Sequence, residues 1–329
     1  MNILLACILL PAGFALLMKG ADFLIDGAVA LSQRFGVSPL IIGLTVVAMG
    51  TSAPEVAASI TAALSGKGDM AIGNVFGSNI ANLALVGGAC AMLRPLQVRL
   101  STLKRELPLM LIVALLLWPF LHNLRLERTE SLFMLAVFIA VITLTIYFGI
   151  KDSRKESAAV KLLEEEVKEK TTSIPQTIPW SLLLIILGLG GLTIGARLTI
   201  ESASFIGEAI GLSQAVIGST IIAIGTSLPE LMTGLIAAKK GHDDISLGNI
   251  VGSNVFNTML VIGAAGIIRP FDISARFAGP DYWIMIAVSI IFLVIAGIYK
   301  KIGKKSGLLL VCIYIGYLVY LLAISDPTA

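Results

Sequence analysis

The chain contains an internal duplication: residues 20–95 align without a gap to residues 195–270, and 31 of the 76 aligned positions are identical. The most similar blocks read GTSAPE at 50–55 and GTSLPE at 225–230, then GNVFGSNIAN at 73–82 and GNIVGSNVFN at 248–257. A repeat of this length predicts a molecule built from two equivalent halves.

Apolar segments long enough to cross a lipid bilayer recur through both halves. Of the 329 residues, 57% are hydrophobic and 14% charged, whereas soluble domains carry roughly 25% charged residues. The sequence therefore predicts an all-α membrane protein with ten transmembrane helices in two five-helix repeats. The expected helices lie near 2–30, 38–64, 71–93, 107–121, 131–150, 180–208, 213–238, 246–268, 282–299 and 307–324.

A charged connection separates the two repeats. We expect residues 1–150 to form the first repeat, 151–179 a linker and 180–329 the second repeat. The linker has six basic residues, six acidic residues and no aromatic residue, so we expect it to be a solvated, partly helical connector.

Lysine and arginine residues predict the orientation. If both termini face outward, the cytoplasmic connections hold 17 of these residues and the outer connections 5, as the positive-inside rule requires. The linker is then cytoplasmic, and five spans per repeat invert one half relative to the other. Inverted repeats place a substrate site near the bilayer midplane, between the repeats. The small net charge of +3 gives no indication of nucleic-acid binding.

Each repeat places one glutamate, Glu55 or Glu230, inside an apolar run. Glu55 and Asn82 are equidistant from the turn at Gly66–Asp69, and Glu230 and Asn257 are equidistant from the corresponding turn at residues 241–244. We therefore expect each glutamate to meet an asparagine at mid-membrane depth. Carboxylates are rare there and usually functional.

A polar face accompanies each glutamate. Asn74, Ser78 and Asn82 recur every four residues and so line one helix face, as do Asn249, Ser253 and Asn257. The glycines of these helices also recur every four residues, which favours close helix packing; they are Gly73, Gly77, Gly248 and Gly252.

Two prolines, Pro54 and Pro229, predict breaks in the second and seventh helices. Such a break is tolerated in a membrane where it lines a cavity or the protein interior. Freed carbonyls, hydroxyls and carboxylates are hard oxygen donors, which suit Ca²⁺, Na⁺ or Mg²⁺. Protons or several Na⁺ ions are alternative occupants of a site with two facing acids.

Two further acids lie on the first and sixth helices. Asp26 and Glu201 occupy equivalent positions, and a place at a helix end explains them more simply than a gating role. Asp22 is matched by Arg197, so it is not part of a symmetric site.

At the two glutamate motifs the chain resembles the cation/Ca²⁺ exchanger superfamily, and most closely its prokaryotic sodium/calcium antiporters. The resemblance covers both halves and implies ten helices, inverted repeats and a central site at which Na⁺ entry drives Ca²⁺ out. It implies Ca²⁺ ligands at the carboxylates of Glu55 and Glu230 and the carbonyls of Thr51 and Thr226.

The same resemblance implies Na⁺ ligands at four serine hydroxyls and two backbone carbonyls, with amides at the centre. These residues are Ser52, Ser78, Ser227, Ser253, Ala48, Ala223, Asn82 and Asn257. Some family members, including the potassium-dependent branch, have an aspartate where this chain has Asn257, which argues against K⁺ transport here.

The sequence therefore predicts a Na⁺/Ca²⁺ antiporter of the inner membrane that works by alternating access. It predicts no enzyme activity and no cofactor; the partners are the two ions and the lipid bilayer. A proton/calcium exchanger on the same scaffold is the alternative. An intramembrane hydrolase would need a nucleophile with a base, which a symmetric Glu/Asn pair does not supply, and broken helices between inverted repeats favour alternating access over a passive channel.

Overall fold

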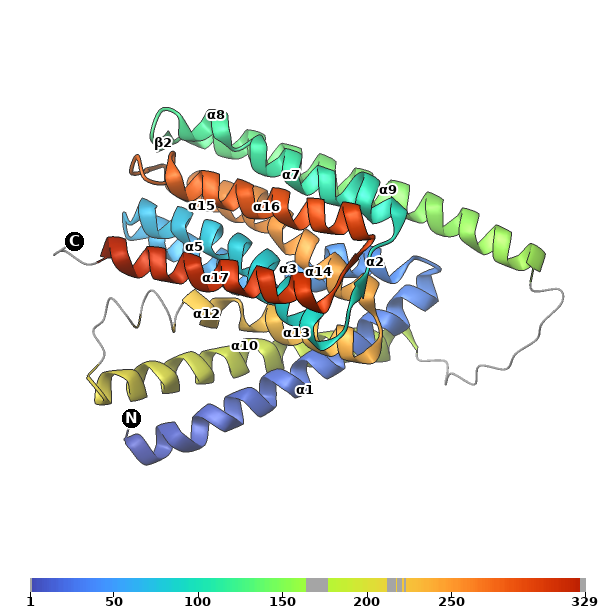
Figure 1. Ribbon diagram of the computed structural model, residues 1–329, viewed down its shortest axis with the longest axis horizontal. Helices are drawn as coiled ribbons and strands as arrows, with labels where there is room; N and C mark the ends of the chain where they lie inside the picture. The colour runs from blue at the N-terminus through green and yellow to red at the C-terminus, as the bar shows by residue number, and fades with distance from the viewer. Residues whose placement is uncertain (1, 164–176, 212–216, 218–220, 222, 326–329) are drawn as a thin grey trace.

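The computed structural model is a bundle of long helices (Figure 1), and it describes residues 2–163, 177–211, 217, 221 and 223–325. In the first half the helices are α1 (Ile3–Phe35), α2 (Pro39–Ile42), α3 (Ala48–Thr51), α4 (Ala53–Leu64), α5 (Gly68–Ile80), α6 (Gly87–Leu93), α7 (Leu107–Leu115), α8 (Trp118–Leu121) and α9 (Arg128–Leu163). In the second half they are α10 (Ile178–Ala209), α12 (Ala223–Thr226), α13 (Leu228–Lys240), α14 (Asp243–Val255), α15 (Ile262–Ile268), α16 (Pro280–Tyr299) and α17 (Lys304–Ser325).

Short π-helical segments join several of these helices end to end. They are Gly43–Val47 between α2 and α3, Ala81–Val86 between α5 and α6, Thr102–Glu106 before α7, and Phe256–Val261 between α14 and α15. A π-helical segment widens the helix by one residue per turn and is often found at functional sites. The segments Ala81–Val86 and Phe256–Val261 contain Asn82 and Asn257.

In the described part of the chain, seven helices are long and apolar enough to cross a membrane, and α2–α3 with α4 make an eighth span, bent by 43°. The bend confirms the predicted break in the second helix. Two expected spans are not among these: residues 107–121 are divided between α7 and α8, and residues 213–238 fall partly outside the described residues. Pro119 is in the first turn of α8, where a helix restarts without needing the missing amide hydrogen.

Four two-residue strands were not expected from the sequence. Strand β1 (Leu96–Gln97) pairs antiparallel with β4 (Lys301–Ile302), and β2 (Arg125–Leu126) pairs antiparallel with β3 (Phe271–Asp272). Each pair joins a connection of the first half to a connection of the second. Segments this short carry no alternating pattern that a sequence could reveal.

Helices α1 and α10 lie side by side along one edge of the molecule (Figure 1). They pack backbone to backbone: a Cβ added at Gly20 would lie 2.7 Å from the nitrogen of Leu192, and one at Gly188 would lie 2.6 Å from the nitrogen of Leu24. Most of their buried side chains belong to a small apolar cluster that also contains residues of α2, α13 and α14, and Val47 of a π-helical segment. A larger cluster fills the space between α4–α7, α9 and α14–α17.

The predicted close packing of the polar-face glycines holds in the second repeat. Cβ atoms added at Gly248 and Gly252 would lie 2.7 Å and 2.6 Å from the carbonyl oxygens of Leu40 and Leu44. In the first repeat, a Cβ at Gly73 would touch only the ring of Phe277, at 3.1 Å, and one at Gly77 would have no described atom within 4 Å. The described contacts therefore support the packing role for the second repeat alone.

Candidate functional site

Glu55 and Glu230 lie in the first turns of α4 and α13, inside the helix bundle. Ser52 separates α3 from α4, and Ser227 separates α12 from α13. Pro54 and Pro229 occupy the first turn of α4 and α13, where proline is tolerated. Glu55 and Glu230 follow in the same first turns, where the helix dipole favours a negative charge. The proline break thus creates the local environment that each carboxylate needs.

Both glutamates are completely buried, with 0% of each residue exposed. Ser52, three residues before Glu55, donates a hydrogen bond to Glu230, so the two halves bring the acids to neighbouring positions. The neighbouring hydroxyls of Thr51, Ser52 and Ser227 are buried as well. Two interacting carboxylates in a buried place repel each other unless a cation or a proton compensates them.

Hydrogen bonds from the first half reach across to the second. The Ser52 hydroxyl donates to Glu230 Oε1 over 3.2 Å, and the Thr51 hydroxyl donates to Asn249 Oδ1 over 3.1 Å. Glu55 instead accepts from Ser78 of its own half, with Oγ and Oε1 3.5 Å apart. The site is therefore shared between α3–α4, α5, α13 and α14.

Many polar atoms at this site have no hydrogen-bond partner within the described part of the protein. They are Oε2 of both Glu55 and Glu230, Oγ of Ser227 and Ser253, Nδ2 of Asn249, and both side-chain polar atoms of Asn82 and Asn257. Buried polar atoms are paired in the great majority of cases. The unpaired oxygens among these are the ligand atoms that a hard cation prefers.

Most of the residues expected at the site are buried, and hydrogen bonds join Ser52 to Glu230 and Ser78 to Glu55. The four serines, the two glutamates, Thr51, Asn82 and Asn257 are all buried, and Ala48 begins α3. Thr226 is partly buried at the end of α12, and Ala223 begins that helix. The structure records no hydrogen bond from Asn82 or Asn257 to a glutamate in the described residues, so the expected Glu–Asn contact stays a prediction.

The sequence placed Asn74 and Asn249 on the polar helix faces but did not predict their hydrogen bonds beside the two glutamates. Asn249 accepts from Thr51, and Asn74 donates to the Glu55 carbonyl over 3.2 Å and to the Ser59 hydroxyl over 2.9 Å. Asn79, which is repeated as Asn254, donates to Thr258 of the other half over 2.9 Å. Their identity in both repeats was the available signal.

A resident metal centre of the usual kind is not found: no three His, Cys, Asp or Glu side chains gather at one place among the described residues. The oxygens of this site come from two carboxylates together with amides and hydroxyls.

Comparison with known proteins gives consistent matches over the whole chain. The family described as "Sodium/calcium exchanger protein" matches twice, at residues 5–147 and 180–323. The putative antiporter CaxA of Alkalimonas amylolytica is 41% identical over 95% of this chain and 98% of its own length. The sodium/calcium exchanger MaX1 of Methanosarcina acetivorans is 32% identical over 95% of this chain and 97% of its own length.

The fold also matches a solved structure, that of the sodium-calcium exchanger NCX_Mj soaked without Na⁺ and Ca²⁺. The TM-score is 0.81 at 28% sequence identity, and the match covers 97% of this chain and all of the other. The chain therefore belongs to the sodium/calcium exchanger family of multi-pass membrane antiporters.

Proposed function

We propose that this protein exchanges Na⁺ for Ca²⁺ across the inner membrane by alternating access at the site between its halves. One observation carries the proposal: Glu55 and Glu230 come from different halves, are fully buried, and each keep one carboxylate oxygen without a partner among the described residues. A carboxylate at mid-membrane costs about 2.5–3.5 kcal/mol on insertion scales. The pair therefore has to be compensated by positive charge throughout the transport cycle.

Two negative charges fit one Ca²⁺ or two Na⁺ ions in turn. Ca²⁺ would take the carboxylates of Glu55 and Glu230 with the carbonyls of Thr51 and Thr226. Na⁺ would take the four serine hydroxyls, namely Ser52, Ser78, Ser227 and Ser253, with the carbonyls of Ala48 and Ala223. Asn82 and Asn257 would complete the centre, which the unpaired amide oxygens of both residues support.

We further propose that the complete protein has ten transmembrane helices in two inverted halves, with both termini outside and residues 151–179 in the cytoplasm. The double match of the family, once per half, supports the two-repeat organisation. The distribution of 17 against 5 basic residues supports the orientation.

A proton/calcium exchanger is the second candidate, because protons relieve the repulsion between Glu55 and Glu230 as well as Na⁺ does. The unpaired hydroxyls of Ser227 and Ser253 favour Na⁺, since protons bound to the carboxylates would need no serine ligand.

The proposal is tested by ⁴⁵Ca²⁺ uptake into proteoliposomes with an imposed gradient of Na⁺, K⁺ or H⁺. We expect uptake with outward-directed Na⁺ and none with K⁺ alone. Uptake driven by a pH gradient in the absence of Na⁺ would establish the proton exchanger instead, and uptake without any gradient partner would refute exchange.

A further inference from the structure

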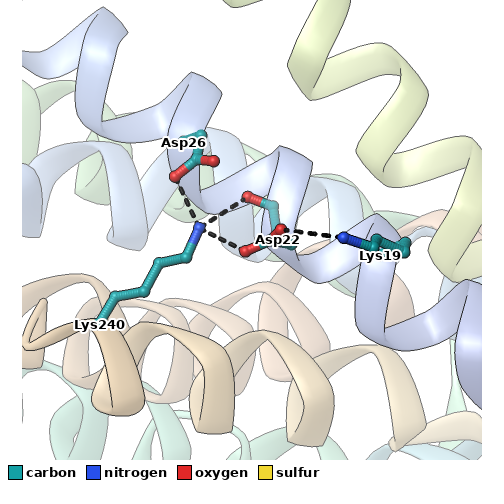
Figure 2. Close-up of polar contacts among 4 residues, drawn as sticks. All are labelled: Lys19, Asp22, Asp26 and Lys240. Carbon is teal, nitrogen blue, oxygen red and sulfur yellow. Dashed lines mark hydrogen bonds and ion pairs between the residues drawn. The ribbon is translucent and has the colours of Figure 1, made fainter.

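A cluster of charged side chains joins α1 to the end of α13 (Figure 2). The Lys240 ammonium lies 2.5 Å from Oδ1 of Asp22 and 2.7 Å from Oδ1 of Asp26. It also donates to the carbonyl oxygen of Asp22 over 3.4 Å. Lys19 contacts the other carboxylate oxygen of Asp22 at 3.9 Å. One lysine at a helix end is thus bound by two acids one turn apart on a long helix.

This contact corrects the interpretation of Asp26 as a residue at a helix end. Helix α1 continues to Phe35, so Asp22 and Asp26 lie within it. The sequence could not show the pairing, because Lys240 is more than two hundred residues away along the chain.

The ion pairs of Lys240 connect α1, which packs along α10, to α13. Helices α1 and α10 pack against each other through glycine backbones, and their small apolar cluster also includes Leu228 and Ala237 of α13. Lys240 belongs to α13, the helix that begins beside Glu230 and Ser227. A change in the position of α1 and α10 relative to α13 would therefore separate Lys240 from its two acids.

The internal repeat identifies the corresponding positions in the other copy. Asp26 corresponds to Glu201 on α10, Asp22 corresponds to Arg197, and Lys240 corresponds to Ser65, which lies two residues before Lys67. In this structure Arg197 Nε and Glu201 Oε1 are 2.6 Å apart within α10, and their side chains are 78% and 53% exposed. Lys67 is exposed in the turn before α5. The acid thus recurs in the other copy, and Lys67 lies two residues from the position equivalent to Lys240. Among the contacts of the described residues, the Lys240 cluster joins two helices, whereas the ion pair of Glu201 lies within α10.

Inverted repeats change state by exchanging the conformations of their two halves. We propose that Lys240, Asp22 and Asp26 form an ionic latch for the conformation seen here, and that Glu201 and Lys67 form the equivalent contact in the opposite-facing conformation. This inference rests on the proposed alternating-access function.

The partial exposure of the latch suits this role. The side chains of Lys240, Asp22 and Asp26 are 27%, 33% and 48% exposed, and ion pairs in contact with water stabilise a structure only modestly. A transporter must populate both conformations, so a tie that shifts their ratio by a small factor is more useful than one that traps a single state.

The test is chemical cross-linking in a chain whose native cysteines, Cys7, Cys90 and Cys312, have been replaced. Glu201→Cys and Lys67→Cys are introduced together, and a short bifunctional thiol reagent is applied to the reconstituted protein. The rate of cross-linking between these two cysteines is measured in the otherwise unchanged chain and again after adding Lys240→Gln. The neighbouring Lys239→Gln is the matched control. The double variant Asp22→Asn/Asp26→Asn opens the same latch from the other side.

We expect the Glu201–Lys67 positions to be linked, and the rate to rise about fivefold with Lys240→Gln, which corresponds to about 1 kcal/mol of lost ion-pair stabilisation. The Asp22→Asn/Asp26→Asn variant should increase the cross-linking rate by the same factor, and Lys239→Gln should leave the rate unchanged. Absence of a link, or equal rates for Lys240→Gln and Lys239→Gln, would overturn the latch. Na⁺-driven ⁴⁵Ca²⁺ uptake in the same vesicles, before linking, tests the proposed function separately, because the link reports proximity and not which ion is carried.

Discussion

The two copies of the central motif have the same residues but different partners. Ser52 of the first copy donates across the interface to Glu230, whereas Oγ of its counterpart Ser227 has no partner in the described part of the chain. Glu55 accepts from Ser78 of its own half, while Glu230 accepts from the opposite half. The repeated sequence has thus produced an asymmetric site, which the proposed inverted-repeat transporter would show in either of its two conformations.

One property survives this asymmetry. Glu55 and Glu230 are both fully buried, and each retains an oxygen that receives no hydrogen bond from the residues that the structure describes. Under the proposed function, the hydroxyl contacts would differ between the two conformations, and the carboxylates would determine what the site binds. The predictions below separate these two contributions.

The largest expected effect comes from neutralising either acid. Glu55→Gln and Glu230→Gln should each abolish Ca²⁺ uptake in proteoliposomes, because the remaining single charge cannot compensate a divalent ion. Both variants should remain folded, since the repulsion between the acids is removed as well.

The matched control for these variants is Glu127→Gln, which changes an exposed glutamate and should leave uptake unchanged. Near-normal Ca²⁺ uptake by either site variant would show that the substituted glutamate is not needed to bind the transported ion.

The next prediction concerns the inversion of the halves and has an all-or-none readout. In a background without native cysteines, an impermeant thiol reagent should label Lys67→Cys in intact cells. Lys239→Cys, near the equivalent turn of the second copy, and Ser157→Cys in the linker should be labelled only after permeabilisation. Labelling of Ser157→Cys from outside would reverse the proposed orientation.

Asn257→Asp tests what the central charge determines. The change makes the formal charge of the site more negative, from −2 to −3. The Coulomb energy of one added pair is about 4 kcal/mol at 4 Å and an effective dielectric constant of 20. After desolvation we expect Ca²⁺ to bind about tenfold more tightly, and Na⁺-driven flux to acquire sensitivity to K⁺.

The wild-type protein is the control, and its flux should be the same with and without K⁺. A strict K⁺ requirement of the wild type would mean that the charge at residue 257 does not decide which ions are carried.

The smallest effect should distinguish the two equivalent serines. Ser52→Ala removes a hydrogen bond to a carboxylate, which typically stabilises a protein by about 1.5–3 kcal/mol, so it should lower the melting temperature in ion-free detergent. Ser227→Ala removes a hydroxyl that has no partner here and should leave the melting temperature unchanged while weakening Na⁺ binding. Equal losses of stability in the two variants would contradict the asymmetry.

The repeated motifs allowed much of the site to be predicted from sequence. Glu55 and Glu230 each follow a proline directly, the serines recur at fixed spacing before and after it, and a costly acid in an apolar run is a local signal. The bend between α3 and α4 followed from Pro54 in the same way, because proline acts on its own helix.

Contacts between distant segments were not predictable from these signals. The hydrogen bond from Thr51 to Asn249 spans 198 positions of the chain. Helix α1 extends to Phe35 and α9 to Leu163, beyond their apolar segments, because polar residues continue a helix once its apolar part is packed. The two-residue strands likewise depend on a partner from the other half.

The central claim is that Glu55 and Glu230 form one cation site rather than one site in each half. Equilibrium binding of ⁴⁵Ca²⁺ to the purified protein tests it most directly. We predict one Ca²⁺ per chain, displaced by Na⁺, with binding lost in Glu55→Gln and in Glu230→Gln alike. Two Ca²⁺ ions per chain, or a single-site variant that retains half of the bound Ca²⁺, would contradict the shared site.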